Sequence, residues 1–307
     1  MGSEMCIRDR CKSYYVYKLQ DPLLSMFYTK LFERKNQIKN GRYHNLTNVL
    51  SNVDVSLTTH GERIESVHIT IESILSGKVL PARIILWLDD ENAIRNLPMS
   101  LVRLKNRGLE IKLSKNYGPH TKYFPYILEG KHKDYLVTAD DDIIYPKNWL
   151  FDLYSAAKCY SDVIVCHRAH EITFDAQRKF KPYEEWNACR SVEKNIAFFA
   201  TGVSGVIYPK KFLEHLLRAG DDFINKCPRA DDVWLHYIAY VNNYKVMQLK
   251  KTSAHFLIVN NTQHLGLMNT NVLMNQNDSQ IMNTYSLKDM ENIFLLSNNI
   301  ESIKTNN

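Results

Sequence analysis

Several patterns that would assign a function at once are missing from this chain of 307 residues. No run reaches about 18 consecutive apolar residues, which argues against an integral membrane protein. The six cysteines form no C-x-x-C pair, so we expect reduced thiols, as in a cytosolic protein, and no zinc cluster. No RNA-recognition signature, helix-turn-helix pattern or zinc-finger spacing occurs, so we expect no nucleic-acid partner. The chain also lacks the G-x-x-x-x-G-K-[ST] and G-x-G-x-x-G patterns, which argues against a P-loop or a dinucleotide-binding fold.

The composition is that of an ordinary globular protein. Hydrophobic residues make up 45% and charged residues 23%, which is enough apolar material for a sizeable core and excludes a disordered chain. The formal net charge is +6, from 39 Lys and Arg against 33 Asp and Glu. Such a mild excess suits an acidic substrate or an anionic membrane surface.

The chain divides into four parts. Residues 1–10, MGSEMCIRDR, resemble translated sequencing-adapter sequence, and we set them aside as an artefact. Residues 11–50 mix aromatic and basic side chains, and they predict either a helical lead-in packed on the main domain or a surface that touches a membrane or a partner. Residues 51–250 form a regular main domain, and residues 251–307 form a C-terminal extension that we expect to pack on it.

Strand and helix patterns alternate through the main domain. The strands are predicted at 53–59, 82–90, 109–114, 133–142, 161–167 and 245–249. The helices are predicted at 66–77, 97–108, 146–160, 209–220 and 230–243. This alternation is typical of parallel β-α-β units. The sequence therefore predicts an α/β fold with an open, twisted, mostly parallel sheet flanked by helices.

Three carboxylates follow directly on one predicted buried strand, in YLVTADDDIIYP. Ligands of such sheets bind beyond the carboxyl ends of the strands. Alternate residues of an extended chain point to the same side, so Asp140 and Asp142 can converge on one site, with Asp141 between them. Two close carboxylates repel each other unless a cation or protons relieve them, and hard oxygen ligands select Mg²⁺ or Mn²⁺. The alternative is a solvated acidic turn that caps the next helix.

A second acidic pair lies in CPRADDVWLHYIA. Asp231 and Asp232 stand at a predicted helix N-terminus, where the helix dipole favours negative charge, so structural capping is a real alternative. The functional interpretation is that Asp232 acts as a general base toward an attacking hydroxyl.

Two further segments carry polar or cationic side chains. In SLTTHGERIESV, the residues Thr58, Thr59 and Arg63 can hold a nucleotide's base, ribose and phosphates. In NYGPHTKYFPYI, a Gly-Pro turn leads into Lys122, which is either a surface lysine or an ammonium group beside a diphosphate.

Two glycines and two histidines each allow both a functional and a structural interpretation. Gly202 and Gly205 permit either close approach of the backbone to a ligand or tight packing. His255 and His264 lie on apolar-flanked segments, where a satisfied histidine is commoner than a metal ligand.

Together these segments resemble the GT-A nucleotide-sugar glycosyltransferases, in particular bacterial family-2-like members. The resemblance runs from about residue 53 to about residue 249, and it makes residues 51–250 the catalytic domain. The most specific parts are the triple-Asp strand end and the Asp-Asp-Val-Trp segment.

The resemblance implies roles for individual residues. Asp140 and Asp142 match the two acids of the D-x-D motif, which hold the metal and the donor nucleotide. Asp232 matches the catalytic aspartate, with Asp231 where the family often has Glu. Asp89 matches an acid that often contacts the nucleoside. A C-terminal histidine sometimes completes the metal shell in the family.

We therefore expect a metal-dependent glycosyltransferase that uses Mn²⁺ or Mg²⁺. It would move a sugar from a nucleotide-diphosphate donor, a UDP-sugar, to a hydroxyl of a glycan or lipid-linked acceptor, with inversion. Thr58, Thr59, Arg63, Asp89, Lys122, Asp140 and Asp141 would bind the donor. The resemblance places the protein in the cytoplasm, with peripheral contact to the anionic inner face of the cell membrane. Two alternatives are a nucleotidyl- or phosphoryl-transferase and a non-catalytic carbohydrate-binding protein on the same fold.

Overall fold

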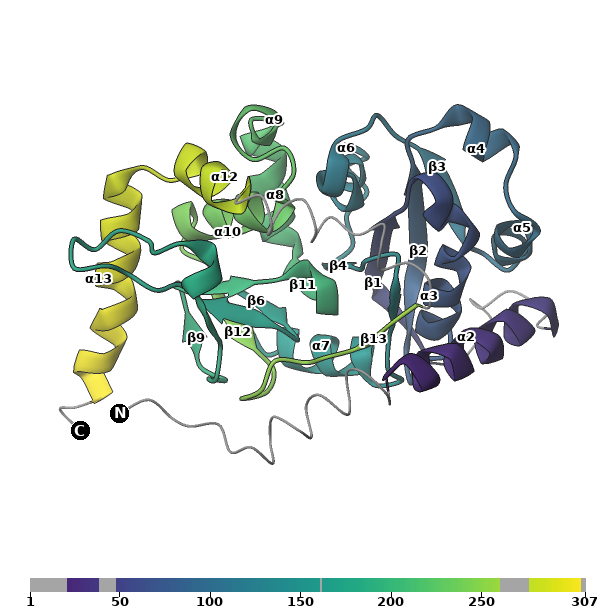
Figure 1. The fold of residues 1–307 in the computed structure, drawn as a ribbon, viewed down its shortest axis with the longest axis horizontal. Helices are drawn as coiled ribbons and strands as arrows, with labels where there is room; N and C mark the ends of the chain where they lie inside the picture. The colour runs from purple at the N-terminus through teal and green to yellow at the C-terminus, as the bar shows by residue number, and fades with distance from the viewer. Residues whose placement is uncertain (1–20, 39–47, 161, 260–275, 305–307) are drawn as a thin grey trace.

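A mixed eight-stranded sheet runs through the molecule in the order β3-β2-β1-β4-β11-β6-β12-β9 (Figure 1). The computed structural model describes residues 21–38, 48–160, 162–259 and 276–304. The strands of this sheet are β1 (Val49–Thr58), β2 (Leu80–Leu88), β3 (Glu110–Leu113), β4 (Tyr135–Thr138), β6 (Val163–Cys166), β9 (Lys194–Asn195), β11 (Val206–Pro209) and β12 (Lys245–Gln248). Neighbouring strands pair in parallel except around β11 and at β9. The predicted α/β class with a mostly parallel sheet is confirmed.

Strand β11 departs from the parallel β-α-β pattern, because it pairs antiparallel with both β4 and β6. Only the single turn η6 (Gly202–Ser204) separates it from the preceding strand β10 (Phe198–Ala200). Between β6 and β11 the described chain forms short strands and 3-10 turns but no α-helix, so it re-enters the sheet at the end where β6 leaves it and runs antiparallel to β6.

Helices cover both faces of the sheet. Alternate strand residues face opposite sides: Leu136 of β4 belongs to one buried cluster and Val137 to the other. The helical segments are α2 (Asp21–Ile38), α3 (Val67–Ile74), α4 (Glu91–Arg95), α5 (Met99–Asn106), α6 (Phe124–Leu128), α7 (Trp149–Ala157), α8 (Lys210–Ala219), α9 (Phe223–Lys226), α10 (Asp231–Val241), α12 (Gln276–Thr284) and α13 (Leu287–Lys304). Residues of α6, α8 and α10 contribute to the first cluster, and residues of α3, α5 and α7 to the second. None of the helices in the described ranges is long and apolar enough to cross a membrane.

The first and last helices are fastened to the sheet domain at different ends. Helix α2 packs on α3 and α5, where the buried Asn36 amide donates to the Glu72 carboxylate at 3.1 Å. Helix α13 lies along the opposite end of the molecule, next to β9 in the view of Figure 1. Ile281 of α12 and Met290 of α13 belong to the same buried cluster as α10.

Two small sheets complete the fold. One has the order β10-β7-β8, with β7 at Ala169–Glu171 and β8 at Asn187–Ala188. The other pairs β13 (Leu257–Ile258) with β5 (Ile143–Ile144), the strand that follows the three acids. Just beyond β13, the backbone N–H of Val259 donates to the Asp142 carbonyl oxygen at 2.7 Å. The segment after β12 is thereby tied to the loop that carries the acids.

Candidate functional site

The loop after β1 holds two of the three consecutive acids. The Thr59 hydroxyl donates to Asp141 Oδ2 at 2.6 Å, and the Arg63 guanidinium, from η3 (Gly61–Glu65), lies 2.7 Å from Asp141 Oδ1. The same guanidinium lies 3.1 Å from Asp142 Oδ2. Thr59 and Asp141 are both buried, so each is committed to the other and neither presents its side chain to solvent.

Lys122 joins the third acid to the second acidic pair. Its ammonium nitrogen lies 2.7 Å from Asp140 Oδ1 and 3.2 Å from Asp231 Oδ2. Lys122 ends η4 (Gly118–Lys122), and Asp231 begins α10, so two segments on one side of the sheet meet the end of β4. We call the five carboxylates of this region (Asp140, Asp141, Asp142, Asp231 and Asp232) the acid cluster.

Asp232 is held by a backbone donor. The Gly202 N–H points between the two carboxylate oxygens of Asp232, at 3.1 and 3.2 Å. A β-carbon on Gly202 would lie 3.2 Å from Asp232 Oδ1 and 3.4 Å from the Lys122 ammonium, so glycine here lets the backbone approach both groups. Both groups belong to the protein itself, so these contacts show tight packing at Gly202, and close approach of its backbone to a ligand stays a prediction.

The expected convergence of Asp140 and Asp142 on one side is altered by the local backbone. Strand β4 ends at Thr138, and the acids lie on the turn that follows it. Asp141 and Asp142 therefore share Arg63, whereas Asp140 faces Lys122. The strict alternation of an extended chain does not apply beyond the last strand residue.

The electrostatics of the site follow from burial and from an excess of negative charge. Burial raises the pKa of Asp142 to about 7, and the neighbouring Asp140 and Asp141 carboxylates add to the rise. Burial also raises the pKa of Asp231 and of Asp232, although Lys122 opposes the shift in both.

Lys122 shows the complementary response. Its burial disfavours the charged form, but the carboxylates of Asp140, Asp231 and Asp232 outweigh that penalty and raise its pKa well above the ordinary value. Lys122 is thus a permanent cation inside the acid cluster.

The acid cluster has the donor chemistry for a divalent cation bound together with phosphate oxygens. Its five carboxylates face only two cations, Arg63 and Lys122, in the contacts of the described residues. The contacts of Asp140 and Asp142 within the described ranges engage one oxygen of each, and their side chains are 26% and 19% exposed. No group of three or more His, Cys, Asp or Glu in the described ranges is arranged to hold a metal ion. Two carboxylates with the remaining ligands from phosphate and water is an arrangement typical of Mg²⁺ sites.

Two of the other predicted site residues, Thr58 and His255, form hydrogen bonds with groups outside the acid cluster. The Thr58 hydroxyl donates to the Trp87 carbonyl oxygen at 3.1 Å, which joins β1 to β2 at the sheet edge. Asp89 follows β2 at the same edge and is partly exposed. His255 Nε2 lies 2.7 Å from Asp21 Oδ2 of α2, so this ring nitrogen contacts a carboxylate that is not part of the acid cluster. His264 lies outside the described residues.

Sequence reasoning missed the residues whose hydrogen bonds hold the backbone of the turn at residues 140–142, which we call the acid turn. The Asp140 N–H donates to the Tyr145 hydroxyl at 2.9 Å, and the Tyr145 N–H donates to the Ser73 hydroxyl at 3.0 Å. The Thr70 hydroxyl donates to the Asp141 carbonyl oxygen at 2.9 Å. Ser73 and Thr70 lie on the buried face of α3, and no signal in their own segment distinguishes them from packing residues.

Part of the chain is similar to parts of two solved structures. No protein-family model matches the chain, and no curated protein matches it. The chain is similar to the crystal structure of GalNAc-T7 with UDP, GalNAc and Mn²⁺, at 12% identity and a TM-score of 0.46. It is also similar to the mannosyltransferase PcManGT from Pyrobaculum calidifontis in complex with GDP-Man and Mn²⁺, at 11% identity and a TM-score of 0.43. The matches cover 64% and 77% of this chain, and they span only 42% and 64% of those two chains.

Proposed function

We propose that the protein is a metal-dependent glycosyltransferase of the GT-A type, with a bacterial family-2-like catalytic domain over residues 51–250. It would transfer a sugar from a nucleotide-diphosphate donor, a UDP-sugar, to a hydroxyl of a glycan or lipid-linked acceptor, with inversion at the anomeric carbon. The observation that carries the proposal is the meeting of two distant acidic segments at Lys122, which lies 2.7 Å from Asp140 and 3.2 Å from Asp231.

Asp232 is suited to the role of general base. In the transfer, the acceptor oxygen forms a bond to the anomeric carbon, the bond from that carbon to the diphosphate oxygen breaks, and the hydroxyl proton passes to an Asp232 oxygen. The burial that raises the pKa of Asp232 also makes its carboxylate a stronger proton acceptor than an exposed aspartate. The Gly202 N–H orients the carboxylate before the acceptor arrives.

Asp140 and Asp142 are the residues that would hold the divalent cation. When bound, Mn²⁺ or Mg²⁺ neutralises charge on the leaving diphosphate as a Lewis acid. Arg63 and Lys122 add positive charge at the same edge, and their ion pairs keep the acids in place.

The remaining predicted residues divide into supporting and ligand-facing roles. Thr59 and Asp141 are buried against each other, and this supports a positioning role, since together they hold Arg63 and the acid turn. Thr58 and Asp89 lie at the open sheet edge, where contact with the nucleoside is the role we propose. Asp231 keeps Lys122 in place beside Asp140.

The first experiment is a screen of nucleotide sugars with Mn²⁺ or Mg²⁺, monitored for slow donor hydrolysis. Release of a nucleoside diphosphate supports sugar transfer. Release of pyrophosphate, or formation of a new phosphoester, would instead identify a nucleotidyl- or phosphoryl-transferase. A complete lack of turnover with every donor and either metal would remove the catalytic proposal.

The decisive variant is Asp232→Asn, which keeps the shape of the side chain and removes its ability to accept a proton. We expect turnover to fall by about 10²–10⁴, the usual range for loss of a general base. Donor binding, measured by calorimetry, should stay within a few-fold of the unaltered protein.

The matched control is Asp221→Asn, an exposed aspartate beside α9, which should leave turnover unchanged. Normal turnover in Asp232→Asn would exclude Asp232 as the base.

A further inference from the structure

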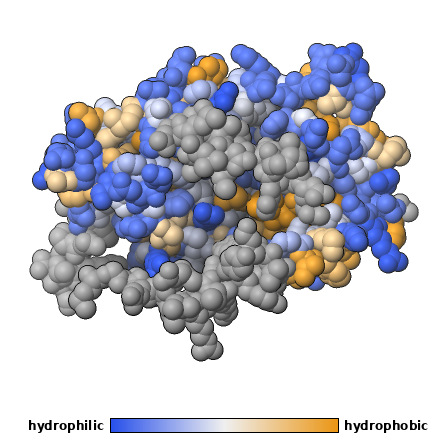
Figure 2. All heavy atoms as spheres, in the orientation of Figure 1, coloured by the Kyte–Doolittle hydropathy of each residue, from blue (hydrophilic) through white to orange (hydrophobic). Residues whose placement is uncertain are grey.

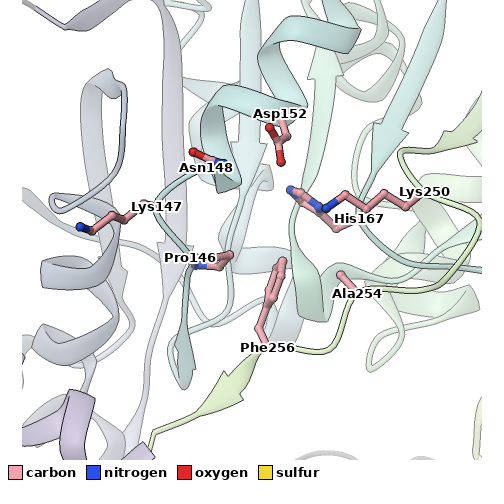
Figure 3. A pocket seen from close by; sticks show the side chains of 8 residues that line it. All are labelled: Pro146, Lys147, Asn148, Asp152, His167, Lys250, Ala254 and Phe256. Atoms are coloured by element: carbon pink, nitrogen blue, oxygen red, sulfur yellow. The ribbon is translucent and has the colours of Figure 1, made fainter. Parts of the chain in front are cut away.

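A cavity of about 410 Å³ lies beside the first turn of α7, apart from the residues of the acid cluster (Figure 3). Its wall includes Asn148 and Asp152 of the α7 region, His167, Lys250 and Phe256. His167 follows β6 and Lys250 follows β12, so the cavity lies at the carboxyl ends of these strands. Because β4 points the same way as β6, the cavity and the acid cluster share one edge of the sheet.

The hydrogen bond of one ring nitrogen sets the tautomer of His167. Its Nε2 lies 3.1 Å from the Trp149 carbonyl oxygen, and a carbonyl only accepts, so Nε2 carries the proton. Burial lowers the pKa of the imidazole and keeps it neutral, which leaves Nδ1 with a free lone pair.

Three charged side chains line the cavity, Lys147, Asp152 and Lys250, and the two that point toward His167 have opposite signs. In Figure 3 the Asp152 carboxylate and the Lys250 ammonium both point toward the region of His167, whereas Lys147 points away. Neither Asp152 nor Lys250 forms an ion pair within the described part of the chain. Both are therefore available to a ligand.

An aromatic ring closes one side of the cavity. The Phe256 ring centroid lies 5.3 Å from that of His167 and 6.0 Å from that of Tyr145, and Phe256 is only partly buried. Such a ring offers a flat apolar surface to the C–H face of a ligand.

These groups select the chemistry of the ligand. The Asp152 carboxylate and the His167 lone pair disfavour an anion, and the Lys250 ammonium disfavours a cation. Sugar hydroxyls both donate and accept, so they can satisfy all three groups at once, while the ring face of the sugar lies on Phe256. The volume falls within the usual range of about 300–1,000 Å³ for small-molecule sites.

We propose that this cavity binds one neutral sugar unit of a glycan. The inference rests on the proposed function and deepens it: the acceptor would be a glycan of several units, held here by a unit other than the one that reacts. Tyr145 connects the two regions, since its hydroxyl accepts from the Asp140 N–H and its ring packs against Phe256 and, at 4.1 Å between centroids, Trp149.

The test measures binding without donor or metal. The full chain is labelled at histidine Cε1, and the His167 NMR signal, identified by its absence from His167→Gln, is followed during titration. The probes are the methyl glycosides of glucose, galactose, mannose and N-acetylglucosamine, with inorganic phosphate as the anionic comparison. We expect at least one glycoside to shift the signal with millimolar affinity and phosphate to leave it in place.

Variants separate a built site from nonspecific contact. Lys250→Gln and Asp152→Asn should each weaken glycoside binding about tenfold, as expected for loss of a hydrogen bond to a charged group. Lys251→Gln, an exposed neighbour, should bind as the unaltered protein does. The proposal is overturned if no glycoside shifts the His167 signal, if phosphate alone shifts it, or if Lys251→Gln weakens binding as much as Lys250→Gln.

Failure of this site and failure of the enzyme give different results. Donor hydrolysis needs no acceptor, so it is measured separately from glycoside binding, and the control Lys251→Gln should hydrolyse the donor at the unaltered rate. Glycoside binding in a protein that never turns over a donor would support the cavity and overturn the catalytic role. Donor turnover without glycoside binding would support the catalytic role and overturn the sugar-binding role of the cavity.

Discussion

The ammonium group of Lys122 lies between two carboxylates that belong to distant segments of the chain. The Lys122 side chain is only 9% exposed, and Asp231 is similarly enclosed at 10%. Removing one member of a buried ion pair costs more than the pair contributes, because it leaves the partner's charge unpaired in a poorly solvated place. Lys122 therefore supports the protein's stability as well as the geometry of the acid cluster.

Replacement of Lys122 by Met should lower the free energy of unfolding by about 3–5 kcal/mol near neutral pH. Without the cation the acids prefer their protonated forms, so the loss should shrink as the pH falls and they take up protons. Urea unfolding in the presence of a chelator, at neutral and at mildly acidic pH, measures both effects. Lys105→Met, at an exposed position on α5, is the control and should change stability little. An equal loss at both pH values would contradict the electrostatic explanation.

At the scale of single elements, the longer strands and helices of the main domain could be predicted because their patterns are local, whereas short elements such as β9 and α6 were missed. Strand β2 ends in a continuous apolar run over residues 84–88, and α8 ends just before Gly220, whose positive φ of 63° explains why the helix stops there. The direction of β11 could not be predicted, because it depends on the absence of a crossover helix rather than on the strand's own residues.

The partners of the site residues were less accessible to sequence reasoning than the elements. The chemistry of Asp140 and Asp232 shows in their local motifs, and both lie in the acid cluster. That Lys122 joins the two acidic segments depends on how η4 and α10 pack at the end of β4, which no local pattern encodes. The mutual burial of Thr59 and Asp141 has the same origin.

Helix α2 presents an exposed stripe in which apolar side chains stand on both sides of two basic ones. Leu23, Phe27, Lys30, Arg34 and Ile38 follow helical spacing along one face, and the three apolar members are 64%, 61% and 62% exposed. Apolar residues appear over α2 at the lower right of the view in Figure 2. Such a face suits contact with an anionic lipid surface, where the apolar groups enter the interface and the cations meet the head groups.

The double variant Leu23→Ser, Phe27→Ser should bind anionic phosphatidylglycerol vesicles at least about tenfold more weakly, since burial of each apolar side chain contributes about 1.5–3 kcal/mol. Co-sedimentation with vesicles measures this. Met99→Ser removes an equally exposed apolar side chain, at 64%, from α5, and it should not affect binding. If the unaltered protein does not sediment with anionic vesicles, the peripheral membrane contact is excluded.

Across the whole molecule, some buried groups make the fold less stable as the pH falls, and others make it more stable. His120 and His236 are buried, and burial lowers their pKa values to about 3 and about 4. Each Nε2 donates to a backbone carbonyl oxygen, of Cys227 at 2.8 Å and of Ile196 at 2.9 Å. Below the ordinary histidine pKa of about 6.5, these histidines take up protons in the unfolded chain but stay neutral in the folded protein. Acidification therefore destabilises the fold. Asp142, whose pKa is raised, acts in the opposite direction, because the folded state then binds the extra proton.

The variant His236→Gln isolates one side of this balance. It should be less stable than the unaltered protein at neutral pH, because it loses the hydrogen bonds of the imidazole. The difference should narrow by up to about 1.4 kcal/mol for each pH unit between about 6.5 and about 4, since the variant has no imidazole for the unfolded chain to protonate. Urea unfolding across this range measures the difference, and a constant gap would show that His236 is not held neutral by the fold.

The pairing of β13 with β5 has a practical consequence for anyone who shortens the chain. The Ser25 hydroxyl of α2 donates to the Ile258 carbonyl oxygen at 2.5 Å, and the next residue, Val259, donates its N–H to Asp142. A truncated protein that starts at residue 48 would keep every residue of the acid cluster and yet lose the outer support of that cluster's backbone. If such a truncated protein lost activity, the cause would be weaker support of the backbone around the acid cluster, because all five carboxylates would still be present.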